Sequence, residues 1–408
     1  MQATLPSSAS SFDRAAERAR VQQERRRNAI VDLVVTLSTI ALALLVGFLV
    51  MLVVGKDPIL AYSSLLSGPL SRSHRAGRWI EDATTLIILG LSVAIPFRAR
   101  QFSLGAQGQM FIAAMIAAVI AIYLPLPPVL AILLPLAAAM LAGFVTGLLP
   151  GLIKAYLNAN EIVSTLMLNA VIVLLYDFLL TNVFTPPGAQ SLRSELIQPN
   201  SMLLRLSAIF GINLGRANLA VVMAAVLVLA VWVLLSRTPL GYEIRIIGAN
   251  EKFARYGGIN TQRTIALSFA IGGAIAAVAG VHLVLGVHQR LIPAIAAGLG
   301  FEGIVVALLA RNNPLLIPIT GLFYSYLRVG GDIMEQEAAV GAEIVQVIPG
   351  RHHLAAHRPG AGGLRQIAPI ASRAQRVRRH ATYFPVCIPW NKHFKRSSAR
   401  PSSPQCCG

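Results

Sequence analysis

The chain has 408 residues, of which 55% are hydrophobic and only 13% are charged, and its mean hydropathy is +0.65. A soluble protein cannot bury so much apolar surface, so the composition excludes a soluble multidomain enzyme. It predicts an all-α fold, a polytopic helical membrane protein. Eleven of the basic residues behind the net charge of +18 lie in residues 351–408, which contain no acidic residue. The rest of the chain carries 18 − 11 = +7, so the charge does not indicate nucleic-acid binding.

Residues 1–28 are polar and include three consecutive arginines, Arg25 to Arg27. An uncharged run from Leu33 to Val54 follows, long enough to cross a bilayer of about 30 Å. Its apolar core is longer than that of a cleavable signal peptide. We therefore expect an uncleaved first span, with the arginines as an orientation signal that keeps the N-terminus in the cytoplasm. The predicted domains are an N-terminal segment (1–28), a membrane domain (29–349) and a tail (350–408).

The next segment, Gly55 to Glu81, is polar and predicts an external loop. A short apolar run, Ala83 to Phe97, then leads to FSLGAQGQM, residues 102–110. Few polar residues and two glycines between apolar runs are typical of a broken helix that lines a cavity at membrane depth. Gln107 and Gln109 are thus candidate pathway residues. The alternative is a close helix contact through the glycines.

A proline-containing turn separates two further apolar runs, 110–124 and 129–153, and the segment NANEIVSTLMLNA begins the next helix at residues 158–170. Its polar residues fall near one helical face. Polar stripes on membrane helices usually face partners or a water-filled path. The alternative is helix capping and interhelix bonding, because an acid at the first turn complements the helix dipole. The candidate residues are Asn160, Glu161, Thr165 and Asn169.

After a polar, proline-containing loop at Thr181 to Asn218, the apolar run Leu219 to Leu235 leads to GYEIRIIGANEKFARYGGINTQR, residues 241–263. This charged island lies before a second bilayer-length run, Thr264 to Val287. It cannot lie in hydrocarbon and must emerge into water. Its positive excess favours the cytoplasmic side. An ordinary solvated connector is the alternative to a functional loop.

The remaining runs complete about nine spans, or nine to ten helices. Gly272, Ala276 and Gly280 form a small-residue face that predicts close helix packing. The run Leu291 to Ala310 contains LGFEG, an echo of the earlier LGAQG. Matching broken segments in two halves suggest an internal repeat. Glu302 in the second copy is a candidate pathway residue, and if buried it needs a partner.

The pattern GxNxxxxxYxGI, formed by Gly248, Asn250, Tyr256, Gly258 and Ile259, resembles the ATPase-coupling loop of bacterial ABC importer permeases. The string NEIVSTLMLN, residues 160–169, and the segment around Gln107 resemble the same proteins. The likeness is to the ribose and branched-chain amino-acid type, and within it to nucleoside importers. Those permeases usually carry Asn where Ser103 stands and Glu where Gln107 stands.

The resemblance implies a non-enzymatic permease in a bacterial inner membrane that needs no cofactor. An ATPase subunit, a second permease subunit or a second copy, and an extracytoplasmic binding protein would complete the transporter. Tyr256 and Ile259 would anchor the ATPase, Arg255 would make a charge contact, and Gly248 and Gly258 would permit tight turns. The sequence has no GxxxxGK[ST] motif, so ATP hydrolysis belongs on another chain. The implied solute is a nucleoside or a simple sugar.

Two other classes remain open on the residues alone. An ion-coupled secondary transporter would need paired membrane acids or a proton relay, for which the candidates are Glu302, Asp177 and His282. Nothing in the sequence speaks for a scaffold protein. All three cysteines lie in the tail, so the membrane domain offers neither a disulfide nor a thiolate metal site.

The tail changes composition abruptly at Gly350, where the resembling permeases continue into one more span. We interpret residues 350–408 as disordered and out of the ancestral reading frame. Translating the gene in the other two frames tests this, because one of them should encode an apolar run of about 20 residues. A genuine basic tail for nucleic acid or anionic lipid is the alternative.

Overall fold

A computed structural model describes residues 45–49, 51–53, 55–205, 217–296 and 298–338. The chain divides into two units after Arg351, and all of the described residues belong to the first. The predicted N-terminal segment, most of the first predicted span and the tail from Gly350 lie outside the described residues.

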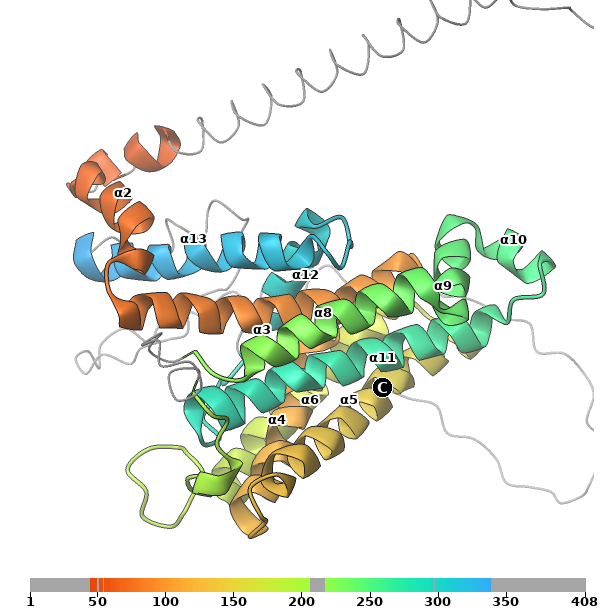
Figure 1. The fold of residues 1–408 in the computed structure, drawn as a ribbon, viewed down its shortest axis with the longest axis horizontal. Coiled ribbons are helices and arrows are strands. Elements are labelled where there is room, and N and C mark those ends of the chain that lie inside the picture. Colours follow the sequence, from red (N-terminus) through yellow and green to blue (C-terminus); the bar gives the residue numbers. More distant parts are fainter. Residues whose placement is uncertain (1–44, 50, 54, 206–216, 297, 339–408) are drawn as a thin grey trace, which may run out of the picture. The chain divides into compact units, whose positions relative to one another are not determined.

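The described part is helical, apart from one isolated antiparallel bridge between Arg205 and Asn218. The helices are drawn in Figure 1. In chain order they are α2 (Pro58–Ser67), η1 (Gly68–Leu70), α3 (Ser73–Arg98), α4 (Ala106–Tyr123), α5 (Leu130–Leu157), α6 (Glu161–Leu179), η2 (Leu180–Phe184), η3 (Pro199–Ser201), α8 (Ala220–Arg237), α9 (Pro239–Ala249), α10 (Glu251–Tyr256), α11 (Thr261–Val281), η4 (His282–His288), α12 (Leu299–Leu309) and α13 (Ile317–Ala338).

Six helical segments in the described residues are long and apolar enough to cross a membrane, namely α3, α4, α5, α6 with η2, α8, and α11 with η4. The expected nine spans are therefore not confirmed. The sequence predicts that the run Leu291 to Ala310 crosses the membrane, but among its described residues only the 11 of α12 are helical. At 1.5 Å per residue this helix is about 16 Å long, roughly half of the hydrocarbon thickness. Helix α13 is long enough, with 22 residues, but falls short in apolar character.

Helices α3 and α11 form the centre of the helix layers. Their apolar stretches are largely buried, whereas those of α5, α6 and α8 are mostly exposed. In Figure 1, α3, α8 and α11 run along a common direction, and α3 packs against both α8 and α11. The exposed side chains of the outer helices are mainly Leu, Val, Ile and Met. An apolar exterior of this kind suits a helix surrounded by lipid.

Small residues allow α11 to approach its neighbours closely, as predicted. A Cβ added at Gly272 would lie 2.7 Å from the backbone oxygen of Ser92 in α3. Gly280 lies against the backbone of Met110 in α4, and Gly273 against that of Gly143 in α5. Larger side chains at these positions would force the helices apart.

The expected external loop at Gly55 to Glu81 is mostly helical, which corrects that prediction. Asp57 caps α2 by accepting a hydrogen bond from the backbone N–H of Ile59 at 2.9 Å, and Pro58 suits the first helical position. Helix α3 starts at Ser73 and continues through Pro96 to Arg98. Its first three turns were read as loop because they carry the charged residues that precede the apolar run.

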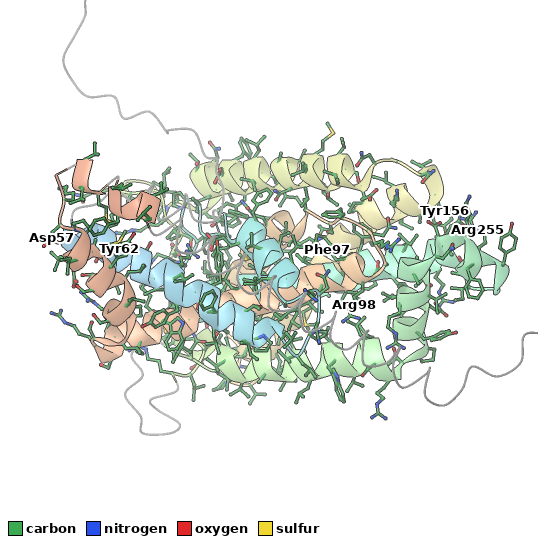
Figure 2. All side chains as sticks on the ribbon, turned by 90° about the horizontal axis from the view of Figure 1, so that it is seen from above. Asp57, Tyr62, Phe97, Arg98, Tyr156 and Arg255 are labelled. Atoms are coloured by element: carbon green, nitrogen blue, oxygen red, sulfur yellow. The ribbon has the colours of Figure 1, made fainter. Side chains whose placement is uncertain are left out.

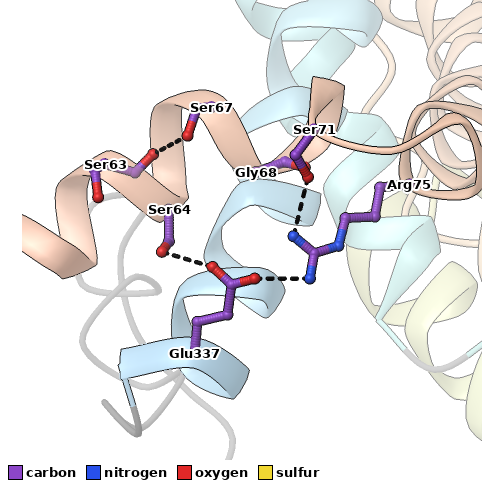
Figure 3. Close-up of polar contacts among 7 residues, drawn as sticks. All are labelled: Ser63, Ser64, Ser67, Gly68, Ser71, Arg75 and Glu337. Atoms are coloured by element: carbon purple, nitrogen blue, oxygen red, sulfur yellow. Dashed lines mark hydrogen bonds and ion pairs between the residues drawn. The ribbon is translucent and has the colours of Figure 1, made fainter.

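Glu337 at the end of α13 joins these N-terminal helices (Figure 3). The Arg75 guanidinium donates to Glu337 Oε1 at 2.7 Å, and the Ser64 hydroxyl donates to Glu337 Oε2 at 2.8 Å. Arg75 also donates to the Ser71 hydroxyl at 3.1 Å. Polar side chains in α2, α3 and α13 thus satisfy one another at this corner.

Helices α3 and α13 run antiparallel. Arg75 near the start of α3 pairs with Glu337 near the end of α13, and Arg78 pairs with Asp332 at 2.5 Å. At the other end of α3, Arg98 Nε donates to the backbone oxygen of Asn312 at 2.8 Å, in the turn before α13. The charged residues at the start of α3 therefore form ion pairs that hold α3 against α13.

Candidate functional site

The polar island predicted to leave the membrane forms two short helices, α9 and α10. We call residues 239–260 the elbow. In Figure 1, α10 lies at one end of the helix layers and α2 at the other. Figure 2 shows Arg255 at the opposite end from Asp57 and Tyr62. The elbow is therefore separated from the corner around Glu337 by the length of the spanning helices.

Asn250 makes the bend between the two helices. It ends α9, and its side chain caps α10 by accepting from the backbone N–H of Phe253 at 3.1 Å. Gly258 follows α10 with φ of 81°, a left-handed conformation in which glycine is not strained. Asn260 then caps α11 by accepting from the backbone N–H of Arg263 at 3.1 Å. Capping residues thus give this charged stretch a defined path.

The elbow is fixed to three spanning helices through α9. Arg245 donates to the backbone oxygen of Leu235 in α8 at 2.7 Å, and Glu243 accepts from the hydroxyl of Thr264 in α11 at 2.6 Å. Gly248 is buried within α9, directly against the backbone oxygen of Arg98 at the end of α3. Gly248 therefore serves close packing rather than the expected tight turn. A push on α9 would reach α3, α8 and α11 together.

The far side of α10 is open. The exposed fractions are 89% for Tyr256 and 65% for Phe253. Arg255 is also exposed and pairs with Glu251 at 3.2 Å, one helical turn earlier. Ile259 is partly buried against the apolar core, so it also anchors the elbow from within. The two exposed aromatic rings, one helical turn apart, therefore offer an apolar contact surface to a partner.

The second group of predicted residues lies where α4 meets α6. Thr165 is fully buried; its hydroxyl accepts from the backbone N–H of Leu104 at 3.2 Å and donates to the backbone oxygen of Glu161 at 2.7 Å. A Cβ added at Gly108 would lie 2.9 Å from Asn169 Oδ1. Gln109 is buried close to Gly105 and Gly147. The glycines permit close helix contact here, while polar groups lie along the same interface.

The two echo segments touch each other. Gly300, the second residue of α12, lies against Gln107, the second residue of α4. A Cβ added at Gly300 would lie 2.5 Å from the Cβ of Gln107. Gln107 Oε1 and Asn169 Oδ1 are both buried without a protein hydrogen-bond partner. Buried amide oxygens of this kind are usually satisfied by water or a ligand.

Asn160 and Glu161 have the capping geometry that was the alternative to pathway lining. Asn160 caps α6 by accepting from the backbone N–H of Ile162 at 2.9 Å. Glu161 pairs with Lys154 at the end of α5 at 2.8 Å. Asn160 therefore caps α6, and Glu161 joins α5 to α6 one helical turn before Thr165, whose hydroxyl donates to the Glu161 backbone oxygen.

Glu302 has the partner that its position requires. It pairs with Arg328 of α13 at 3.1 Å. Of the other two residues considered for an ion-coupled mechanism, His282 is buried and Asp177 is exposed on α6. Within the described ranges, no group of three or more His, Cys, Asp or Glu residues is placed to hold a metal ion.

Sequence reasoning missed three residues that build these sites. Phe253 was overlooked, although its place one turn before Tyr256 in a charged stretch signals an exposed ring. Arg98 was considered only as the residue after the apolar run. Its backbone oxygen packs against Gly248, and its side chain donates to the backbone oxygen of Asn312. Arg328 had no local signal as the partner of Glu302, because 26 residues separate them.

Comparisons with known proteins find transport permeases. The chain is 29% identical to a glucose ABC transporter permease of Haloferax volcanii, across 76% of this chain and 83% of the relative. It is 28% identical to a guanosine permease of Bacillus subtilis (78% and 90%) and to a nucleoside permease of Lactococcus lactis (79% and 89%). No solved structure matches significantly. The family described as branched-chain amino acid transport system / permease component matches residues 76–350, and the chain belongs to this family.

Proposed function

We propose that this chain moves a nucleoside or a simple sugar inward across a bacterial inner membrane. As a permease component it is not the catalytic subunit, so the energy comes from a separate ATPase. The partners are that ATPase, a second permease subunit or a second copy of this chain, and an extracytoplasmic binding protein. The N-terminus and the elbow face the cytoplasm.

One observation carries this proposal, namely the way in which the elbow is mounted. Tyr256 and Phe253 are exposed on α10, while α9 is fixed to the ends of α3, α8 and α11. The exposed aromatic pair gives the ATPase a surface to bind, and the attachment of α9 would transmit its movement to the spanning helices. The mechanism is alternating access, in which helix groups rock about a central polar path. The candidate path residues are Gln107, Gln109, Thr165, Asn169 and Glu302, with Asn160 and Glu161 at the helix head.

The solute follows from the relatives, whose names specify glucose, guanosine and nucleosides. The experiment compares uptake of labelled guanosine, glucose and leucine in cells with and without the gene. We expect loss of guanosine or glucose uptake on deletion and its return with the restored gene. Loss of leucine uptake alone would overturn the proposed substrate class.

The ion-coupled alternative predicts a different energy source. A proton or sodium ionophore would then stop uptake while ATP is still present. An ATP-driven importer keeps working under the same conditions, and stops when the partner ATPase is inactivated. Continued uptake without that ATPase would contradict the proposal.

A further inference from the structure

A cavity of about 330 Å³ lies at the other end of α3 from the elbow. Arg78, Glu81 and Asp82 of α3 and Arg328 of α13 provide its charged wall. Asp82 is 16 residues before Arg98, which places it about 24 Å along the helix from the elbow. The volume is near the lower end of the range for small-molecule sites, about 300–1,000 Å³.

Both arginines of the charged wall already have carboxylate partners. Arg78 pairs with Asp332 at 2.5 Å, and Arg328 pairs with Glu302 at 3.1 Å. The lining adds two acids, Glu81 and Asp82, to the two arginines. Charged side chains among membrane helices are costly and usually mark a solute or ion path. Four of them around one cavity suggest more than helix packing.

The opposite wall is mostly apolar, with His288 as its polar side chain, and has irregular backbone. Leu283, Val287, Ile292 and Ile295 line it. The π-helix η4 carries the first two, and Gln289 and Ala294 adopt left-handed conformations with φ of 57° and 53°. Non-helical backbone at membrane depth is tolerated where it lines a cavity, and π-helical turns are frequent at functional sites.

This wall is held in place from outside. The Tyr176 hydroxyl donates to the backbone oxygen of Ile292 at 2.8 Å. The backbone N–H of Ser194 donates to the backbone oxygen of Leu291 at 3.0 Å. The site is therefore formed by the fold of one subunit. It does not depend on the elbow residues.

These observations select the chemistry of the occupant. A phosphate or a carboxylate would need an uncompensated arginine, and both arginines here have carboxylate partners. An amino-acid zwitterion would need separate free charges of both signs. The paired arginines offer N–H donors, and the carboxylates around them offer oxygen lone pairs, which together suit the hydroxyl groups of a neutral solute. The apolar wall suits the flat C–H face of a sugar ring or a nucleobase.

We propose that this cavity is a solute-binding chamber that holds a sugar ring by its hydroxyls, between the charged wall of α3 and α13 and the apolar wall of η4. The ring is a free hexose or the ribose of a nucleoside. This inference rests on the proposed function and specifies where and how the solute is recognised.

The test uses two substitutions in the complete transporter. Val287→Trp fills the cavity. Its matched control is Val222→Trp, which places the same side chain in a second cavity of about 370 Å³ lined only by apolar residues. Asp82→Asn is nearly isosteric; it removes the negative charge of this side chain and replaces one acceptor oxygen with an amide donor. Each variant is assayed for uptake of labelled guanosine and glucose, and for thermal unfolding in detergent.

We expect Val287→Trp to lower uptake at least about tenfold and Val222→Trp to leave it unchanged. Asp82→Asn should raise KM at least about tenfold, because a lost hydrogen bond to a charged group costs about that much. Wild-type uptake of 2′,3′-dideoxyguanosine, or of dideoxyglucose if glucose is the solute, should be at least about tenfold weaker than that of the parent compound. This hydroxyl preference should shrink in Asp82→Asn.

The two proposals fail in different ways. If the wild type takes up guanosine or glucose but Val287→Trp and Asp82→Asn do so equally well, the chamber is wrong and the proposed function stands. If either variant fails to fold, equal uptake of the dideoxy and parent compounds by the wild type still overturns the chamber. If the wild type takes up neither compound, both proposals fall.

Discussion

Gly300 lies directly against Gln107, so the second residue of α12 packs on the second residue of α4. Both residues belong to the short echoing segments LGFEG and LGAQG. Each segment starts a helix that follows a non-helical stretch. Two broken helices whose heads touch are what an internally repeated transporter places near its centre. The contact thus supports the predicted repeat independently of the sequence similarity between the two segments.

This contact predicts the effect of Gly300→Val. An added Cβ would lie 2.5 Å from Gln107 Cβ and 2.8 Å from the Gln107 backbone nitrogen, and neither can withdraw without moving α4. We expect overpacking to cost about 1–3 kcal/mol of unfolding free energy. Thermal unfolding in detergent measures it. The control is Gly257→Ala, whose Cβ would have no neighbour nearer than 3.4 Å. Equal stability of the two variants would contradict the close contact.

The exposed aromatic pair predicts a loss of coupling. Phe253→Ala with Tyr256→Ala should leave folding unchanged, because both rings are exposed. We expect the double variant to lose most ATPase stimulation and uptake, by at least about tenfold, since aromatic anchors often contribute 2 kcal/mol or more to an interface. Co-purification with the ATPase provides a direct readout. Tyr123→Ala, at an exposed tyrosine outside the elbow, serves as the matched control.

Arg255 gives a separate prediction based on charge. Arg255→Glu reverses the charge beside Glu251, its partner at 3.2 Å. The exposed pair itself contributes little, about 0–1 kcal/mol, so the helix should persist. We expect uptake to be abolished while affinity for the extracytoplasmic binding protein stays at the wild-type value, and Arg255→Lys should retain part of the activity. Undiminished uptake by Arg255→Glu would remove Arg255 from the coupling surface.

Glu337 predicts a pH effect at the opposite end. Hydrogen bonds from Arg75 and Ser64 lower the pKa of the Glu337 carboxyl. The unfolded carboxyl titrates at about 4.3. The carboxylate therefore stabilises the fold above that pH, and the stabilisation is lost as the pH falls through the lower folded pKa. Between pH 5 and 3 the melting temperature of wild type should fall more than that of Glu337→Gln. Parallel curves would exclude a contribution from this pair.

The sequence predicted a helical membrane protein, the break in the helices just before Gln107 and the separation of residues 241–263 from the long apolar helices. These features depend on local composition, which hydropathy and glycine content report directly. The need of Glu302 for a partner also followed from its position. The identity of that partner did not, since Arg328 lies on another helix and only the fold brings the two together.

The errors have a common physical cause. Charged residues in the first turns of α3 suggested a loop, because a sequence does not show that Asp332 and Glu337 will neutralise Arg78 and Arg75. The run Leu291 to Ala310 was long enough to cross, yet its first part forms the irregular wall beside η4. Gly248 suggested a turn, whereas in the structure its missing side chain allows the backbone oxygen of Arg98 to approach α9 closely. Each error concerns contacts between segments far apart in the chain.

The most direct test of the central claim locates the elbow with respect to the membrane. Three cysteines occur in the chain, at positions 387, 406 and 407, and serine can replace them. Lys252→Cys then places a single thiol on the exposed surface of α10, and Asn200→Cys places one in the exposed loop before α8. We predict that a membrane-impermeant maleimide labels intact cells only at position 200, and labels position 252 after permeabilisation. Labelling of position 252 in intact cells would contradict a cytoplasmic elbow gripped by an ATPase.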